Sequence, residues 1–422
     1  SMAQDKDLKT PNVPPLRFPG FTDKWKRIKV SELLDFYSTN SLSWDMLNYD
    51  GGEIKNLHYG LIHSGLPTLV DVSKDSFPFV NEASTPKKYT LCKEGDVAFA
   101  DASEDTNEVG KVVEFLNTNG ENIISGLHTI HGRDKSDMTV TGFKGYAFSS
   151  MPFHHQIRRI AQGTKIYSIS TKTFDEVYIG VPTKDEQAKI ARLLQLLDER
   201  IATQNKIIED LKKLKSAIMA ITFGKSNVTK NQWREVRLGN ICERVTRRNS
   251  NNISNLILTI AAQYGLVSQI DFFNKSVASA DLSNYYLLDK GDFAYNKSYS
   301  GEYTWGAVKR LDLYPQGVLS PLYICFRPME GIIDSDFLVY LFESKCWYRE
   351  VSEICVEGAR NHGLLNVSVV DFFNMKLHLP DLSEQKRIAE MMNAISDKIE
   401  HSSRLYALYN NQKTYLLSNM FI

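Results

Sequence analysis

The stretch that decides the fold is residues 181–223, VPTKDEQAKIARLLQLLDERIATQNKIIEDLKKLKSAIMAITF. The same pattern returns at residues 379–421, LPDLSEQKRIAEMMNAISDKIEHSSRLYALYNNQKTYLLSNMF, at one constant offset and without a gap. Both stretches begin with Pro-x-x-x-Glu-Gln-x-x-Ile-Ala, at Pro182 and at Pro380. Unrelated helices need not share such a start, so we interpret the two stretches as an internal repeat.

The apolar residues of both stretches are spaced alternately four and three residues apart, which predicts a coiled-coil seam. The predicted seam residues are Ile190, Leu194, Leu197, Ile201, Ile208, Leu211, Ile218, Ile388, Met392, Ile395, Ile399, Tyr406, Tyr409 and Leu416. Polar residues interrupt the seam at matching places, Gln204 with Ser402 and Lys215 with Lys413. We expect two long helices packed as an antiparallel coiled coil. Two unrelated amphipathic helices, each buried in its own domain, are the alternative.

Each half of the chain also contains many short strand-like runs separated by Gly, Asn and Asp. Landmarks recur in the same order, among them Glu94–Phe99 with Lys290–Tyr295, each of which contains a Gly-Asp turn before a buried strand. The expected fold class is α+β, with two mixed α/β domains separated by the two long helices in a pseudo-twofold arrangement. A helix of about 38 residues rises roughly 57 Å.

The repeat also predicts the domain boundaries. They are residues 1–16 for a flexible N-terminal arm, 17–180 for the first globular domain, 181–223 for the central helix, 224–231 for a linker, 232–378 for the second globular domain and 379–422 for the C-terminal helix.

Composition restricts the function classes. Lys+Arg and Asp+Glu balance at 50 each, so the chain lacks the strong positive charge expected of a protein that binds nucleic acid alone. A DNA-binding role must then depend on local patches or on basic partners. The five cysteines are scattered and predict neither a disulfide framework nor a zinc site. No signal peptide or membrane span is apparent, and we expect a bacterial cytoplasmic, nucleoid-associated protein.

These motifs carry a resemblance to a known family. The opening Val13-Pro-Pro-Leu-Arg-Phe-Pro-Gly-Phe21, the following Trp25, the paired Pro-x-x-x-Glu-Gln helices and the two Gly-Asp strands resemble the specificity subunit of type I restriction-modification systems. The resemblance covers essentially the whole chain. It implies that the two globular domains are target-recognition domains, each reading one half of a bipartite, asymmetric DNA site.

The resemblance also implies partners and cofactors. Such a subunit has no catalytic activity and recruits two methyltransferase subunits that methylate adenine N6, while restriction and translocase subunits complete the host-defence complex. S-adenosylmethionine, ATP and magnesium are expected in those partners, and none in this chain. We expect double-stranded DNA as a ligand, and the faces of Lys184–Lys215 and Leu382–Lys413 that lie off the seam as methyltransferase docking surface.

Residues that contact bases are expected in the loops that differ between the domains, because their side chains can reach donors and acceptors in the major groove. The candidates are Asp101, Ser103, Asp105, Thr106, Asn107, His128, His131 and Arg133 with the loop Gln162–Lys165 in the first domain, and Asn296, Lys297, Ser298, Tyr299, Ser300, Tyr303, Arg360, Asn361 and His362 in the second. Candidates for phosphate contacts are Lys87, Lys88, Arg158, Arg159, Lys165, Arg244, Arg247 and Arg248. An ordinary solvated loop or surface is the alternative at each position.

Other functions leave weaker signals. Asp50, Glu53 and Lys55 have a nuclease-like spacing, so a self-sufficient magnesium-dependent nuclease is one alternative, which cleavage abolished by Glu53→Ala would support. A coiled-coil protein adaptor is the other. His154-His155 lacks a third ligand at metal-binding spacing. We therefore predict no catalytic residue and no metal site in this chain.

Overall fold

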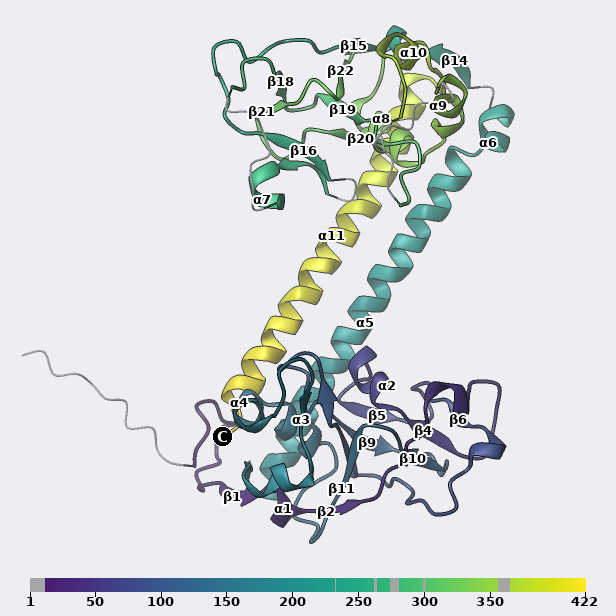
Figure 1. Ribbon diagram of the computed structural model, residues 1–422. Helices are drawn as coiled ribbons and strands as arrows, with labels where there is room; N and C mark the ends of the chain where they lie inside the picture. The colour runs from purple at the N-terminus through teal and green to yellow at the C-terminus, as the bar shows by residue number, and fades with distance from the viewer. Residues whose placement is uncertain (1–11, 232, 262–263, 274–280, 299–300, 356–364) are drawn as a thin grey trace, which may run out of the picture. The chain divides into compact units, whose positions relative to one another are not determined.

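The computed structural model describes residues 12–231, 233–261, 264–273, 281–298, 301–355 and 365–422 (Figure 1). These residues form two compact units. The first unit contains the chain up to Lys206 together with Ser403–Ile422, and the second contains Ile207–Ser402. Because this boundary crosses both long helices, each unit contains one half of each helix.

The two repeated stretches form the long helices α5 (Lys184–Thr222) and α11 (Leu382–Asn419) (Figure 1). Asp381 caps the start of α11, where its carboxylate accepts a hydrogen bond of 2.9 Å from the backbone N–H of Glu384. The predicted linker 224–231 contains a short helix, α6 (Lys225–Lys230). Within the described residues, no helix is both long enough and apolar enough to span a lipid bilayer.

The glutamine of the repeated helix start makes the same two contacts in both units. Gln187 donates to the carbonyl oxygen of the proline five residues earlier (2.9 Å) and accepts from the backbone N–H of Val140 (2.9 Å). Gln385 likewise donates to its proline (3.0 Å) and accepts from the N–H of Asp334 (2.9 Å). Both side chains are fully buried. In each unit the glutamine therefore closes the first helical turn and fixes the helix to the globular domain.

Replacing Gln385 with alanine leaves the part-buried backbone N–H of Asp334 without its side-chain acceptor. We expect the free energy of unfolding of the second unit to fall by about 1–3 kcal/mol, measured by urea denaturation. Lys386→Ala, at the exposed neighbouring position, is the control and should leave the midpoint nearly unchanged. Equal losses in both variants would mean that the buried hydrogen bonds are not responsible.

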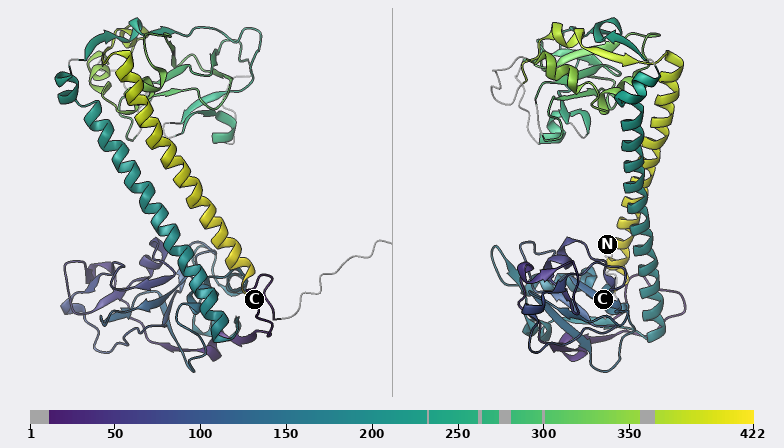
Figure 2. Two further views of the ribbon diagram at one scale, coloured as in Figure 1. Left: turned by 180° about the vertical axis from the view of Figure 1, so that it is seen from behind. Right: turned by 90° about the vertical axis from the view of Figure 1, so that its right-hand side faces the viewer.

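The predicted seam forms a continuous stripe along α5 and α11. All fourteen of its side chains are buried or half-buried. Within the first unit, the N-terminal half of α5 lies beside the C-terminal half of α11 (Figure 2). Lys413 pairs with Asp198 at 2.6 Å and the Tyr409 hydroxyl lies 3.4 Å from Arg200, so the residue numbers run in opposite directions along the pair. The predicted antiparallel packing of the helices is confirmed.

The main sheet of the first unit has the strand order β2-β11-β7-β9-β5 and is antiparallel except for the β5–β9 pair. Its strands are β2 (Leu34–Tyr37), β11 (Thr129–Asp134), β7 (Val97–Ala100), β9 (Val112–Asn117) and β5 (Leu69–Asp71). A second sheet, in the order β10-β4-β6-β3, contains Ile123–Ser125, Lys55–Leu57, Phe79–Val80 and Leu47–Asn48. Two small sheets pair β1 (Lys26–Lys29) with β13 (Tyr178–Val181), and β8 (Ala102–Ser103) with β12 (Tyr167–Ser168). The helices are α1 (Val30–Leu33), α2 (Tyr59–Ser64), α3 (Phe143–Ser149), α4 (Met151–Ile160) and the 3-10 helices η1 (Trp44–Met46), η2 (Glu82–Ser84) and η3 (Thr171–Asp175).

The second unit repeats this framework in shorter form. Its main sheet has the order β15-β22-β19-β20, made of Cys242–Arg244, Ile324–Pro328, Phe293–Asn296 and Ala307–Arg310. Three further pairs are β14 (Arg234–Arg237) with β23 (Lys376–Leu379), β16 (Leu258–Ala261) with β17 (Gly265–Ser268), and β18 (Tyr286–Asp289) with β21 (Gln316–Leu319). The helices are α7 (Gln269–Phe273), α8 (Ser335–Glu343), α9 (Tyr348–Ile354), α10 (Val369–Asn374) and the 3-10 helix η4 (Leu238–Asn240). The predicted α+β class, with two mixed domains and two long helices, is confirmed.

A tryptophan beside the first strand of each domain packs against two phenylalanines. One phenylalanine follows the last turn of a long helix, and the other belongs to a short helix. The sets are Trp25, Phe421 and Phe143 in the first unit, with ring centroids 6.0 to 6.5 Å apart, and Trp233, Phe223 and Phe337 in the second, with centroids 5.6 to 6.1 Å apart. The end of a long helix is therefore part of each domain core.

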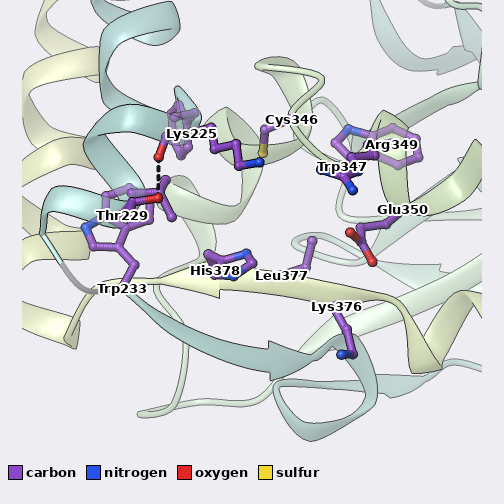
Figure 3. A pocket seen from close by; sticks show the side chains of 12 residues that line it. Lys225, Thr229, Trp233, Cys346, Trp347, Arg349, Glu350, Lys376, Leu377 and His378 are labelled. Carbon is purple, nitrogen blue, oxygen red and sulfur yellow. Dashed lines mark hydrogen bonds between the residues drawn. The ribbon is translucent and has the colours of Figure 1, made fainter.

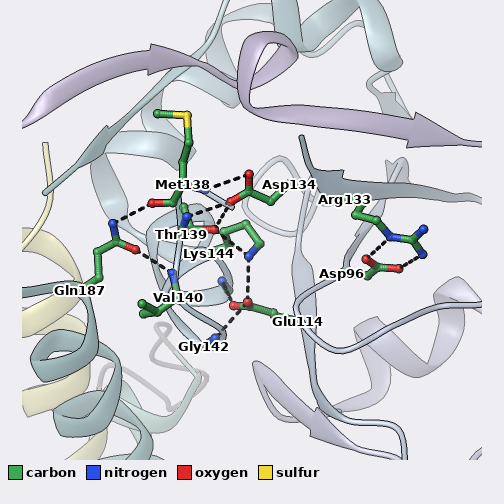
Figure 4. A network of polar contacts seen from close by, with 11 residues as sticks. Asp96, Glu114, Arg133, Asp134, Met138, Thr139, Val140, Gly142, Lys144 and Gln187 are labelled. Carbon is green, nitrogen blue, oxygen red and sulfur yellow. Dashed lines mark hydrogen bonds and ion pairs between the residues drawn. The ribbon is translucent and has the colours of Figure 1, made fainter. Parts of the chain in front are cut away.

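A buried ion pair joins β9 to the start of α3 (Figure 4). The carboxylate of Glu114 lies 3.2 Å from the ammonium of Lys144 and accepts from the backbone N–H groups of Gly142 (2.9 Å) and Gly145 (2.7 Å). Lys144 also donates to the hydroxyl of Thr139 (2.8 Å). Both charged side chains are almost completely buried. Burial raises the pKa of Glu114, although Lys144 and the two backbone donors act in the opposite direction.

Candidate nucleic-acid interface

In each Gly-Asp landmark the carboxylate of the aspartate is buried and accepts hydrogen bonds from an arginine. Asp96 accepts two hydrogen bonds of 2.7 Å from Arg133 (Figure 4), and Asp292 accepts bonds of 2.6 and 2.9 Å from Arg327. Both carboxylates also accept a backbone N–H of the turn, and the preceding glycines have φ of +81° and +96°, a conformation that favours glycine. The paired charges thus fix the start of β7 and of β19.

The arginine also sets the ionisation of Asp96. Burial alone would raise the pKa of this carboxyl, but the hydrogen bonds from Arg133 and His131 outweigh burial and hold the pKa below its usual range. The carboxylate therefore stays charged at neutral pH and keeps both partners in place.

The other end of the same strand joins two loops in each domain. In the first domain the carbonyl oxygen of Asp101, five residues after Asp96, accepts from the N–H of Ile169 (2.9 Å). In the second domain the carbonyl oxygen of Lys297, five residues after Asp292, accepts from the N–H of Leu365 (2.9 Å). Asp101 and Lys297 thus occupy equivalent positions. Each lies directly after the strand, and each is bonded to a segment that follows a helix pair, α3–α4 in the first domain and α8–α9 in the second.

The side chains beside this junction differ between the domains. In the first domain the Asp101 carboxylate lies 3.0 Å from Nδ1 of His128, and the ring of Tyr59 packs edge-on against His128 with centroids 5.1 Å apart. In the second domain the side-chain oxygen of Asn296 accepts from the N–H of Ser298 (3.0 Å) beside Lys297. The backbone framework is shared, while the chemistry that it presents is not.

Known proteins resemble this chain in sequence and in fold. Residues 22–213 match the family described as type I restriction modification DNA specificity domain. The MjaVIII specificity subunit of a type I restriction enzyme from Methanocaldococcus jannaschii is 26% identical over 60% of this chain, and the MjaX putative subunit of the same organism is 24% identical over 78% of each chain. The alignment spans 64% of the length of the MjaVIII subunit. The crystal structure of the S subunit from M. genitalium covers 97% of this chain and 99% of its own, with a TM-score of 0.58 and 14% identity, and therefore shares the fold.

The chain therefore resembles type I specificity subunits in sequence, and the family model matches somewhat less than half of it. The structure brings together several of the side chains that the sequence predicts as base readers in the first domain. Asp101, His128, Ser103 and Asn107 lie on neighbouring loops, and Arg158, a predicted phosphate contact, donates to Asn107 (3.0 Å). The loop of Gln162 and Lys165 closes on β12, which pairs with β8 beside Asp101. Asp105 and Thr106 belong to the same loop as Ser103.

Two predicted base readers bond to Asp96 in this conformation, and their assignment as base readers stays a prediction. His131 is fully buried and bonds to Asp96 at 2.7 Å. Arg133 is committed to the same carboxylate. Asp96 and Asp101 flank β7 and are five residues apart, about 17 Å at 3.3 Å per residue. His131 and Arg133 bond to Asp96, so they lie away from the loop junction at Asp101.

In the second domain Asn296, Lys297 and Ser298 are half-buried beside the junction. Tyr303 is half-buried, with the ammonium of Lys345 4.8 Å from its ring centroid. Tyr299, Ser300, Arg360, Asn361 and His362 lie outside the described residues, and their assignment stays a prediction.

The predicted phosphate contacts are dispersed. Lys87, Lys88, Arg159 and Lys165 are exposed. Arg247 pairs with Asp289 at 2.7 Å, Arg248 bonds to the carbonyl oxygen of Asn284 and stacks on Tyr286, and Arg244 lies 3.4 Å from the Tyr286 hydroxyl. Arg247 therefore lies at the Gly-Asp end of β19 and not beside Lys297.

Sequence reasoning missed the rings that support His128. Trp44, which is 47% exposed, stacks on His58 with centroids 4.2 Å apart, and His58 in turn contacts Tyr59. Burial lowers the pKa of His58, and its Nδ1 accepts from the backbone N–H of Gly60 (3.1 Å). The sequence His58-Tyr-Gly-Leu-Ile62, which recurs as Gln263-Tyr-Gly-Leu-Val267, was the available signal, but the sequence alone does not show that Tyr59 meets His128.

The nuclease-like residues do not form one cluster. Lys55 pairs with Glu121, while Asp50 and Glu53 are exposed. Among the described residues, no group of three or more His, Cys, Asp or Glu side chains is arranged to hold a metal ion.

The second unit contains a cavity of about 500 Å³, lined by Trp233, Trp347, Lys225, Arg349, Lys376 and His378 among others (Figure 3). His378 of β23 corresponds to Gly180 of β13 in the first unit. There, Ile422 lies against Gly180, so close that a Cβ added to the glycine would be 2.3 Å from its side chain. The strand position that Ile422 packs against in the first unit therefore lines a cavity in the second unit.

Proposed function

We propose that this chain is the sequence-specific DNA-recognition subunit of a type I restriction-modification complex, and that each domain reads one half of a bipartite, asymmetric site. The observation that carries the proposal is the loop junction: equivalent positions on one repeated framework present Asp101 in one domain and Lys297 in the other. A repeated framework with different contact residues suits two half-sites of different sequence. The similarity to type I specificity subunits supports the same reading.

The long helices are proposed to hold two methyltransferase subunits. Large apolar side chains are exposed on both helices away from the seam, which is unfavourable unless a partner covers them. They are Leu196, Ile207, Leu214 and Ile221 on α5, and Met391, Leu405, Leu408 and Tyr415 on α11. Three of them on α5 are seven residues apart, the spacing of a second helix-packing stripe.

In this proposal the chain itself performs no catalysis. The methyltransferase partners would bind S-adenosylmethionine and methylate adenine N6, and the restriction subunits would use ATP and magnesium. Because Lys+Arg and Asp+Glu are equal in number, we infer that the partners supply much of the positive charge that faces the phosphates.

The test compares duplex selection from a randomised library by the purified chain alone and by its complex with the methyltransferase. We expect weak, salt-sensitive binding without sequence preference from the chain alone, and a two-part consensus from the complex. Sequencing methylated bases in a host that expresses both proteins should give the same two-part site. Equal affinity with and without the methyltransferase, or a complex that selects no sequence, would overturn the proposal.

A further inference from the structure

The equivalent positions Asp101 and Lys297 differ in hydrogen-bonding character as well as in charge. Each follows a buried strand by the same number of residues, and each is fixed through its own carbonyl oxygen to the second loop. The backbone at the two positions is therefore held in the same way. A difference in what the domains recognise at this point must come from the side chains.

The first domain presents acceptors. A carboxylate has no proton to donate, so Nδ1 of His128 must be the donor in its 3.0 Å contact with Asp101. A neutral imidazole with its proton on Nδ1 leaves Nε2 as an acceptor. The His128 side chain is 50% exposed and that of Asp101 28%, so carboxylate oxygen and ring nitrogen together form an acceptor pair open to a ligand.

The second domain presents donors. The ammonium of Lys297 carries three N–H groups and no acceptor. Next to it, the side-chain oxygen of Asn296 is occupied by the backbone N–H of Ser298 (3.0 Å), which directs the Asn296 amide nitrogen to act as the donor. Both residues are half-buried at the end of β19.

We propose that these positions select bases of opposite hydrogen-bonding character: Asp101 with His128 accepts from the N4 amino group of a cytosine, and Lys297 donates to O6 and N7 of a guanine. Carboxylates pair with cytosine N4, and lysine pairs with guanine O6 and N7, in the major groove. This inference rests on the proposed function, because it names the base that each recognition surface takes. The ring of Tyr59 packs edge-on against His128, and Tyr59 is itself in contact with His58, which packs against Trp44.

The experiment uses the full chain in complex with its methyltransferase, in randomised-site selection at pH 8. Asp101→Asn exchanges an acceptor for an amide that suits adenine N6 and N7, so one cytosine of the first half-site should change to adenine. We expect a discrimination of roughly 10- to 100-fold to be lost or reversed at that base pair, with the other half-site unchanged. Lys297→Gln should change one guanine of the second half-site to adenine in the same way.

Matched controls lie at the other end of the same strands. Glu94→Gln and Lys290→Met alter exposed charges at equivalent positions before the Gly-Asp turns, and both should leave the consensus unchanged. Thermal unfolding identifies a variant that is misfolded. If Asp101→Asn does not fold, Lys297→Gln in the second domain still tests the proposal independently. Loss of a phosphate contact would lower the slope of binding affinity against salt concentration by about one. Because we assign Lys297 to a base and not to a phosphate, this slope should stay unchanged in Lys297→Gln.

The outcomes separate the two levels of the argument. A wild-type complex without any consensus contradicts the proposed function itself. A two-part wild-type consensus that both variants leave unchanged, or a uniform loss of affinity for all sequences, contradicts only the assignment of base contacts to these residues.

Discussion

Lys144→Met is expected to lower the free energy of unfolding of the first unit by about 3–5 kcal/mol, because it leaves a buried carboxylate without its counter-charge. Glu114 and Lys144 are almost completely buried, and the pair fixes β9 to the segment that Gln187 ties to α5 (Figure 4). Urea denaturation of the full chain measures the loss. Lys184→Met is the matched control, because it removes an exposed ion pair with Asp137 at 2.7 Å and should change stability by less than about 1 kcal/mol.

The loss should depend on pH with a definite sign. Burial already raises the pKa of Glu114, and removing Lys144 raises it further. Because the pKa of Glu114 is higher in the folded state than the ordinary glutamate pKa of about 4.3, folding takes up a proton at pH values between these two pKa values. The deficit of Lys144→Met relative to the wild type should therefore shrink as pH falls from 8 toward 5. Adding Glu114→Gln should recover part of the stability at pH 8; a double variant as unstable as the single one would show that packing, not charge, dominates.

Leu197→Asp together with Ile395→Asp is expected to separate the long helices. Leu197 is buried in the first unit and Ile395 is half-buried in the second. An unpaired carboxylate in the seam should cost about 2–5 kcal/mol at each site. Circular dichroism during thermal unfolding measures the stability. In the reconstituted complex, selection of a two-part site should be lost while each half-site is still bound weakly.

The control moves each substitution one residue along its helix. Leu196→Asp and Ala394→Asp place the same charges on exposed positions off the seam, and the thermal midpoint should stay close to that of the wild type. A midpoint that falls equally in both pairs of variants would mean that helix propensity, and not the seam, accounts for the loss.

The sequence predicted the repeated helices well because periodicity and the Pro-x-x-x-Glu-Gln start are local signals. It also located the Gly-Asp turns and the loops that follow them. The sequence did not reveal which contacts the repeated residues make in the folded domains. The partners of Gln187 and Asp96 are Val140 and Arg133, which lie tens of residues away in the sequence. Such pairs become visible only when strands are placed side by side.

The same limitation applies to the predicted base readers His131 and Arg133. His131 and Arg133 alternate on β11 next to His128, and all three are residue types that bind nucleic acid. Pairing of β11 with β7 brings His131 opposite Ala98 and directs it into the domain, toward Asp96. His128, before the strand begins, stays at the surface beside Asp101.

The division of the chain between the units reverses the order in which the domains can be completed during synthesis. The core of the first unit includes Leu416, Met420 and Phe421, whereas the second unit is the single continuous segment Ile207–Ser402. The ribosome synthesises the chain from the N-terminus to the C-terminus. The core of the domain translated first therefore cannot be completed before residues 416–421 have been synthesised, whereas the domain translated second ends at Ser402 and can be completed earlier.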